Sequence, residues 1–209
     1  MLDLHTILAF SVAALALLVV PGPSVLYIVT RSLHQGRVAG LVSVLGVQTG
    51  GLVHVLAAAV GVSALVLSSA LLFSVVKFAG AAYLIYLGVK TMLSREESVL
   101  ERVPAPHSLG QIYRQGALVN ALNPKTALFF LAFLPQFVRP ERGSVAVQTL
   151  LLGALFLGLA TVSDSTYALL AGVIGRKLRQ NQGFLKRQKY LTGGVYVALG
   201  LGAATAGRH

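Results

Sequence analysis

The sequence predicts an all-α polytopic membrane protein, as indicated by its composition, the length of its apolar runs and the placement of its basic residues. The chain has 209 residues, 56% hydrophobic and 11% charged, against about 25% charged in a typical soluble domain. Several apolar runs reach the roughly 20 residues that a helix needs to cross a bilayer. Lys and Arg gather in short segments between these runs, so membrane topology explains the net charge of +11 better than nucleic-acid binding does.

Six apolar segments are long enough to be transmembrane helices. They are residues 6–30, 38–67, 71–93, 116–138, 147–174 and 190–206. A polar linker, residues 94–114, separates two three-span halves, about 1–93 and 115–209, of a single transmembrane domain. Because each half has an odd number of spans, the halves should lie in opposite orientation, which is the topology of an inverted repeat.

The basic residues also predict how the chain is oriented. Of the 17 Lys and Arg residues, 12 lie in the first, third and fifth connections. These connections should be cytoplasmic, with both termini outside. The fifth connection, residues 176–189, is basic enough to touch anionic lipid heads, although a solvated loop that sets topology is the simpler interpretation. No Lys or Arg precedes the first apolar run, so we interpret it as a span rather than a cleaved signal peptide.

Two of the predicted spans are interrupted, at corresponding places in the two halves. The first contains Pro21, Gly22 and Pro23, and the fourth contains Asn123 and Pro124. Proline has no backbone N–H and crowds the preceding turn, while glycine relaxes the backbone. In hydrocarbon the freed backbone groups need partners inside the protein, so such breaks face other helices or a cavity. Paired interruptions of this kind predict the binding site of a transporter.

Ionisable side chains within a span are costly, at about 2.5–3.5 kcal/mol each near a helix centre, and therefore need a reason. Asp164 is the only acidic residue in any predicted span, and Lys125 lies near the middle of the fourth. We expect both to be functional, with a structural ion pair as the alternative. Lys77 lies close enough to a span end to reach the head groups. His54 is either a proton relay or a neutral residue hydrogen-bonded across the bundle.

Depth in the membrane, counted at about 1.5 Å per residue, places Gln48 and Asp164 at the level of the two breaks. A broken helix offers N–H groups on one side and carbonyl groups on the other, so one ligand can meet both signs of charge. Ser24 and Lys125 are candidates to hold a carboxylate. Asp164 and the freed carbonyl groups near residues 19 and 20 are candidates to hold an ammonium group. Such a site suits a zwitterionic amino acid.

The glycine pair Gly46 and Gly50 has the spacing of a small-residue contact between membrane helices. With 22 glycines in the chain, one such pair is weak support for dimerisation. We interpret the pair as close packing within the chain.

Several classes of function lack support. The chain has no cysteine, which excludes disulfides and thiolate metal ligands. It contains no nucleotide-binding, zinc-peptidase or serine-hydrolase motif, so we expect no enzyme activity and no cofactor. Export of a metal cation is an alternative, but a single membrane carboxylate and a lone His54 form a poor ligand set. A non-transporting scaffold, the other alternative, would have no use for the broken helices.

Together these motifs resemble the LysE/RhtB family of bacterial amino-acid exporters (lysine exporter, homoserine/threonine resistance). The matching stretches are Pro21-Gly22-Pro23, Gly46-Val47-Gln48-Thr49-Gly50 with His54, the segment from Gly80 to Gly88, Asn120-Ala121-Leu122-Asn123-Pro124-Lys125, Phe133-Leu134-Pro135-Gln136-Phe137, and Asp164 with Tyr167-Ala168. They cover nearly the whole chain.

The resemblance implies a plasma-membrane (inner-membrane) exporter that moves amino acids or close derivatives outward in exchange for protons, and it allows a homodimer. Asp164 would then couple the proton or bind the ammonium group. The two breaks, with Asn120 in the motif that leads into the second, would form the pathway.

Overall fold

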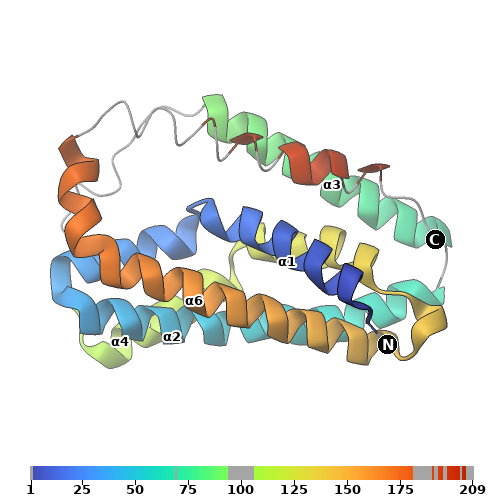
Figure 1. Ribbon diagram of the computed structural model, residues 1–209, viewed down its shortest axis with the longest axis horizontal. Coiled ribbons are helices and arrows are strands. Elements are labelled where there is room, and N and C mark those ends of the chain that lie inside the picture. The colour runs from blue at the N-terminus through green and yellow to red at the C-terminus, as the bar shows by residue number, and fades with distance from the viewer. Residues whose placement is uncertain are drawn as a thin grey trace.

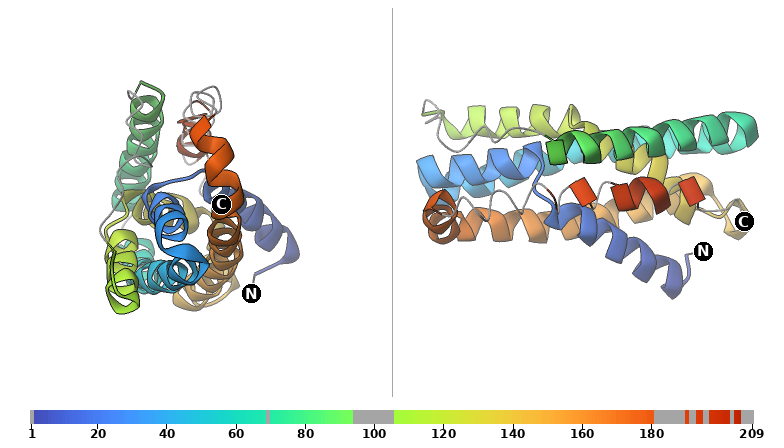
Figure 2. Two further views of the ribbon diagram at one scale, coloured as in Figure 1. Left: turned by 90° about the vertical axis from the view of Figure 1, so that its left-hand side faces the viewer. Right: turned by 90° about the horizontal axis from the view of Figure 1, so that it is seen from above.

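The computed structural model describes residues 2–68, 70–93, 106–180, 190, 193–194, 197–202 and 204–205. Over these residues every regular element is helical and no strand occurs, which confirms the all-α class. The long helices run along one axis and form an elongated bundle (Figure 1, Figure 2).

The first helix, α1 (Leu4–Val19), ends where the sequence predicts an interruption. Asp3 begins the helix by accepting a 2.8 Å hydrogen bond from the backbone N–H of Thr6. Val20, in an extended conformation, ends it, and α2 (Pro23–Ser68) starts three residues later. Pro23 suits this place because the first N–H of a helix has no partner within the helix.

Helix α2 turns back on itself at a single residue. Gly36 has φ 85° and ψ 174°, a conformation that L side chains rarely adopt. In Figure 1 the chain reverses direction at the left-hand end of α2, so α2 is two antiparallel helices, residues 23–35 and 37–68. The second corresponds to the predicted span 38–67.

Helix α3 (Ala70–Leu93) packs against described residues of the predicted sixth span, and the two run side by side in Figure 1. A Cβ on Gly88 would lie 2.6 Å from the carbonyl oxygen of Gly193, and one on Gly200 would lie 2.8 Å from that of Ala81. Glycine therefore lets these backbones approach closely. Parts of the linker 94–114 and of the sixth span fall outside the described residues, as does the side chain of Lys77.

The fourth predicted span is a series of short helices. Ser108 and Gln111 form a reciprocal cap at the start of α4 (Leu109–Ala121), so the helix begins before residue 116, where the sequence placed the span. The following elements are α5 (Pro124–Leu128), a π-helical turn η1 (Phe129–Phe133) and a 3₁₀ turn η2 (Leu134–Phe137). The axis bends by 42° at the break between α4 and α5.

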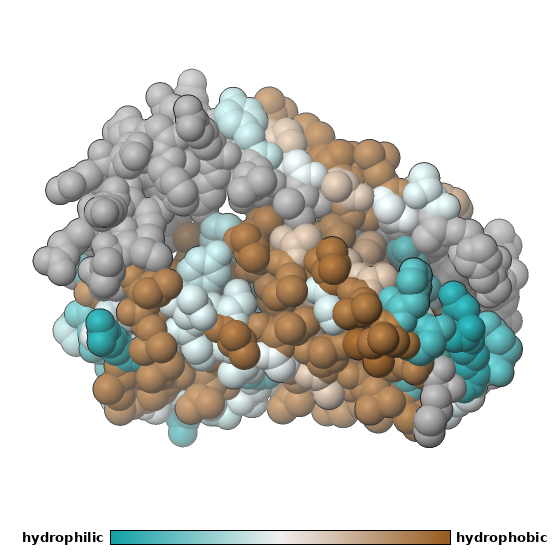
Figure 3. All heavy atoms as spheres, in the orientation of Figure 1, coloured by the Kyte–Doolittle hydropathy of each residue, from teal (hydrophilic) through white to brown (hydrophobic). Residues whose placement is uncertain are grey.

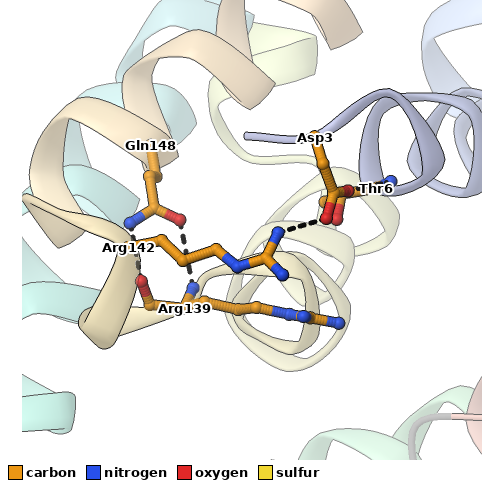
Figure 4. Close-up of polar contacts among 5 residues, drawn as sticks. All are labelled: Asp3, Thr6, Arg139, Arg142 and Gln148. Atoms are coloured by element: carbon orange, nitrogen blue, oxygen red, sulfur yellow. Dashed lines mark hydrogen bonds and ion pairs between the residues drawn. The ribbon is translucent and has the colours of Figure 1, made fainter. Parts of the chain in front are cut away.

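A polar contact joins α1 to the loop before α6 at the end of the bundle where α1 begins. Arg142, in the turn η3 (Pro140–Arg142) before α6 (Val145–Gln180), pairs with Asp3 (Figure 4). Gln148 holds the same loop, donating to the carbonyl of Arg139 at 2.8 Å and accepting from its N–H at 3.1 Å. The hydrogen bonds from Thr6, together with the Arg142 guanidinium, keep the pKa of Asp3 well below its usual range.

Glycines allow α2 to lie in backbone contact with α4. A Cβ on Gly46 would come within 2.2 Å of the carbonyl oxygen of Tyr113, and one on Gly50 within 2.2 Å of that of Ala117. Neither position therefore accepts a side chain unless the helices separate. The prediction that this glycine pair packs within the chain is confirmed.

The apolar core lies between α1, η1 and α6 and is rich in phenylalanine. The ring of Phe129 is 4.9 Å from that of Phe156 and 5.7 Å from that of Phe10, centroid to centroid. All three side chains are buried. This cluster packs η1, which follows the second break, against α1, which ends at the first break.

The outer surface is apolar over much of the face in Figure 3, with strongly polar residues gathered at its right-hand end. Large exposed apolar side chains include Leu8 and Val12 on α1, Leu56 and Val60 on α2 and Val162 on α6. Surface of this kind suits lipid rather than water.

Length and composition alone identify two apolar helical stretches long enough to span a membrane in the described part of the chain, Val145–Ala171 and Pro23–Gly61, and the second of these includes the reversal at Gly36. The bent pair α4 and α5 to η2 makes a third when it is counted as one span. The arrangement of six spans as two inverted halves stays a prediction.

Candidate functional site

A cavity of about 40 Å³ lies where the two helix breaks meet α2 and α6. Seven of the residues singled out from the sequence line it: Gly22, Ser24, Gln48, Asn120, Asn123, Lys125 and Asp164. Thus the structure brings together in one place residues from both halves of the chain.

The carbonyl groups freed at the first break accept hydrogen bonds from the chain itself. The Lys125 ammonium donates to the carbonyl oxygen of Val20 at 2.5 Å, and the Tyr167 hydroxyl donates to that of Val19 at 2.8 Å. The end of a broken helix carries partial negative charge, so a cation is favourable there. These are the two carbonyl groups that the sequence analysis offered to an ammonium group of the ligand.

The second break is built around two asparagines. Asn123 caps α5, because its side chain accepts a 3.0 Å hydrogen bond from the N–H of Lys125. Pro124 follows at the first helical position, where proline is well tolerated. The Asn123 amide also donates to the Ser24 hydroxyl at 2.9 Å, which joins the second break to the first.

Asn120 connects four segments around the cavity. Its side-chain oxygen accepts from the hydroxyls of Ser24 and Thr126, each at 3.1 Å. Its side-chain nitrogen donates to the carbonyl of Val47 at 2.7 Å, on the second helix of α2. Because amide O and N have opposite hydrogen-bonding roles, one orientation of Asn120 satisfies all these partners.

The acidic side of the cavity is formed by α6 and α2. Asp164 is 4% exposed, and one of its carboxylate oxygens accepts a 3.0 Å hydrogen bond from Gln48. Lys125, 7% exposed, lines the same cavity and attracts it electrostatically. A buried carboxylate and a buried ammonium group in one small space can meet both ends of a zwitterion.

The remaining sequence candidates lie behind this lining. His54 donates a 2.7 Å hydrogen bond from Nε2 to the carbonyl of Asn120 and stacks on Phe130, with ring centroids 6.3 Å apart. Pro21, Pro23 and Pro124 are not lining residues and act by shaping the backbone.

Two polar residues at the site were absent from the sequence candidates. Thr126 lines the cavity and bonds Asn120, and Tyr167 bonds the first break. A signal for Tyr167 was available, since it lies three residues after Asp164 and so on the same helix face. The apolar lining residues, which pattern alone cannot tell from core, are Leu17, Leu18, Val25, Val47, Phe156 and Ala160.

From the cavity a row of polar contacts, here called the polar seam, follows α2 toward the Gly36 turn. It consists of Tyr27, Arg31, Gln35, His107 and Gln115. Arg31, 5% exposed, donates to Gln115 at 3.1 Å and lies 2.7 Å from Nδ1 of His107. These hydrogen bonds tie the first helix of α2 to the start of α4 and to His107 just before it.

The family model described as LysE type translocator matches residues 15–207. The chain belongs to this family. The resemblance seen in the motifs is thereby confirmed, and the matched region contains all the cavity residues of this LysE-type translocator.

Among curated relatives, an "uncharacterized membrane protein" of Vibrio cholerae is 31% identical over 98% of this chain and 99% of its own length. The homoserine/homoserine lactone efflux protein of Salmonella typhimurium is 34% identical over 72% of this chain and 73% of its own. A leucine efflux protein of the same species is 32% identical over 62% and 61%. No solved structure matches the chain.

Proposed function

We propose that this LysE-type translocator is a secondary active exporter of amino acids or their close derivatives, working as a proton antiporter in the bacterial plasma membrane. The observation that carries the proposal is the cavity in which Asp164 and Lys125 meet the two helix breaks. Two relatives with efflux names, for homoserine and its lactone and for leucine, support the same class of substrate.

In this proposal the cavity binds both charged groups of an amino acid. Lys125 and Ser24 take the carboxylate, and Asp164 takes the ammonium group, while Leu17 and Phe156 face the side chain. The present cavity of about 40 Å³ has room for water, whereas ligand pockets measure about 300–1,000 Å³. Binding of an amino acid therefore requires the surrounding helices to separate.

Asp164 is the proposed coupling residue. A proton entering from outside neutralises the carboxylate, which releases the substrate's ammonium group outward. The protonated, empty site then turns toward the cytoplasm and releases its proton there, which readies the carboxylate for the next substrate. Because Asp164 is buried and accepts a hydrogen bond from the neutral Gln48, a change in its charge alters the main electrostatic attraction for a cationic group.

For the topology we propose six spans in two inverted three-helix halves, with breaks in the first and fourth and both termini outside. The Gly36 turn and the last turns of α6 share one end of the bundle, opposite the start of α1 (Figure 1). The described parts of the first and fifth connections lie at that end and are basic, which favours a cytoplasmic position. The polar seam, whose Tyr27 lies one helical turn after the cavity residue Ser24, is then the proposed cytoplasmic approach.

Efflux of preloaded labelled amino acids from bacterial cells tests the function. We expect the intact protein to accelerate loss of at least one amino acid under an inward proton gradient. Asp164→Asn, present in the membrane at equal abundance, should not. Transport by Asp164→Asn with unchanged pH dependence would contradict the coupling role.

The same assay decides between classes of function. If the intact protein moves no amino acid in a full panel, the amino-acid class is wrong. A cation panel in proteoliposomes then tests export of another solute. A chain that transports neither would be a scaffold.

A further inference from the structure

We propose that Lys125 is a built-in substitute for the ammonium group of the substrate. With no substrate bound, its own ammonium group donates a hydrogen bond to the backbone carbonyl of Val20. When an amino acid enters, its α-ammonium group replaces Lys125 as the donor to that carbonyl. The released Lys125 side chain then binds the substrate's carboxylate. This rests on the proposed function and assigns to Lys125 a choice between two partners.

The contact that carries the proposal joins the two breaks. Lys125 belongs to the first turn of α5, yet its ammonium donates to Val20, at the last turn of α1. Val20 is itself 1% exposed, and its neighbours Leu18 and Gly22 line the cavity. The acceptor is therefore a buried carbonyl beside the space where a ligand would lie.

Lys125 comes from α5, a helix of five residues, and extends across to the C-terminal end of α1, where the partial charge is negative. A primary ammonium group of the ligand would find the same partial charge and the same acceptor.

The exchange resolves a conflict in the site. Lys125 satisfies the Val20 carbonyl only while its ammonium group stays at the first break, so moving it toward the ligand's carboxylate leaves a buried carbonyl without a donor, which is costly. A zwitterion supplies a donor for Val20 and an acceptor for Lys125 together. A ligand with only one of the two groups leaves one protein group unsatisfied, so the exchange selects molecules that carry both.

The experiment measures equilibrium binding to purified protein in detergent. The first probe is leucine or homoserine, whichever the intact protein binds, and the second is its decarboxylated amine. We expect Lys125→Met to weaken binding of the amino acid and to tighten binding of the amine about tenfold, since the amine no longer competes with Lys125. Lys90→Met, an exposed lysine on α3, is the matched control and should change neither.

A third probe separates the exchange from simple charge repulsion. The N-trimethylated form of the amine has the same charge but no N–H to donate to Val20. The exchange predicts that Lys125→Met improves its binding much less than that of the primary amine. Equal gains for both would overturn the proposal in favour of repulsion, and no gain for the amine would overturn it outright.

Acetylation of the intact protein gives a readout that needs no variant, should Lys125→Met fail to fold. The probe here is the N,N-dimethylated amine, which keeps one N–H when protonated and is not itself acetylated. We expect it to raise the acetylation of Lys125 several-fold relative to Lys90, because it displaces that side chain from Val20. Unchanged acetylation would overturn the exchange while leaving amino-acid export in place. If the intact protein binds neither amino acid and transports none, the proposed function fails, and the exchange fails with it.

Discussion

The side chain of Asn123 donates a 2.9 Å hydrogen bond to the hydroxyl of Ser24, although 99 residues separate them in the chain. Ser24 lies in the first turn of the helix after the first break, and Asn123 caps the helix after the second. The two breaks are therefore one structural unit, and substitutions on either side should affect both.

Replacement of Asn123 tests this unit. Asn123→Ala removes the cap of α5 and the donor to Ser24, and we expect it to cost about 2–3 kcal/mol of stability and most of the transport. Asn123→Ser keeps a capping oxygen and should lose about half as much. Thermal unfolding in detergent measures the difference, and equal losses for the two variants would contradict a capping role.

His54 should be a structural residue and not a proton relay. Its Nε2 donates to the carbonyl of Asn120, and it does not line the cavity. We expect His54→Gln, which retains a donor, to leave the pH dependence of transport unchanged. His54→Ala should lower stability by about 1 kcal/mol. Loss of the pH dependence in His54→Gln at normal abundance would assign the relay role to His54.

The contact between α2 and α4 should not tolerate even one added methyl group. Gly46→Ala places a Cβ against the Tyr113 carbonyl, so we expect a loss of about 1–3 kcal/mol. Gly158→Ala, at a helical glycine of α6 with open space around it, should be neutral or stabilising by up to about 1 kcal/mol. Comparison of the two thermal midpoints checks the prediction, which equal effects would refute.

The stability that the ion pair of Asp3 and Arg142 contributes should decrease as the pH falls. The folded state lowers the pKa of Asp3, so its contribution is complete above the ordinary value of about 3.9 and fades as the pH falls. We expect Asp3→Asn, which keeps a cap for α1, to lower the thermal midpoint at neutral pH. The difference from the intact protein should shrink below about pH 4. A difference that is constant with pH would exclude the ion pair as its source.

Sequence patterns located the two breaks and the buried charges because proline, glycine and ionisable residues are exceptional in a membrane span. They did not reveal where the freed carbonyl groups find donors. That depends on the length of Lys125 reaching α1 and on the orientation of α6, which brings Tyr167 to Val19. Neither follows from spacing along one helix.

The form of two backbone features was likewise hidden. The sequence places a connection between the spans 6–30 and 38–67, but it does not reveal that the reversal needs only Gly36, whose backbone conformation glycine alone readily adopts. The start of α4 at Leu109 depends on the reciprocal cap of Ser108 and Gln111 inside a polar stretch that was interpreted as linker. The capping hydrogen bonds start a helix here although the segment has low hydrophobicity.

The close approach of α2 and α4 limits how this protein can move. Carbonyl oxygens of α4 lie against the glycines of α2. If either helix slid along the other, the backbone of α4 would collide with side chains of α2. We therefore expect the two helices to move together as one rigid body during the transport cycle. The change in shape that admits and releases the substrate then falls to the segments around the two breaks, where Lys125, Tyr167 and Asn123 form hydrogen bonds that can exchange partners.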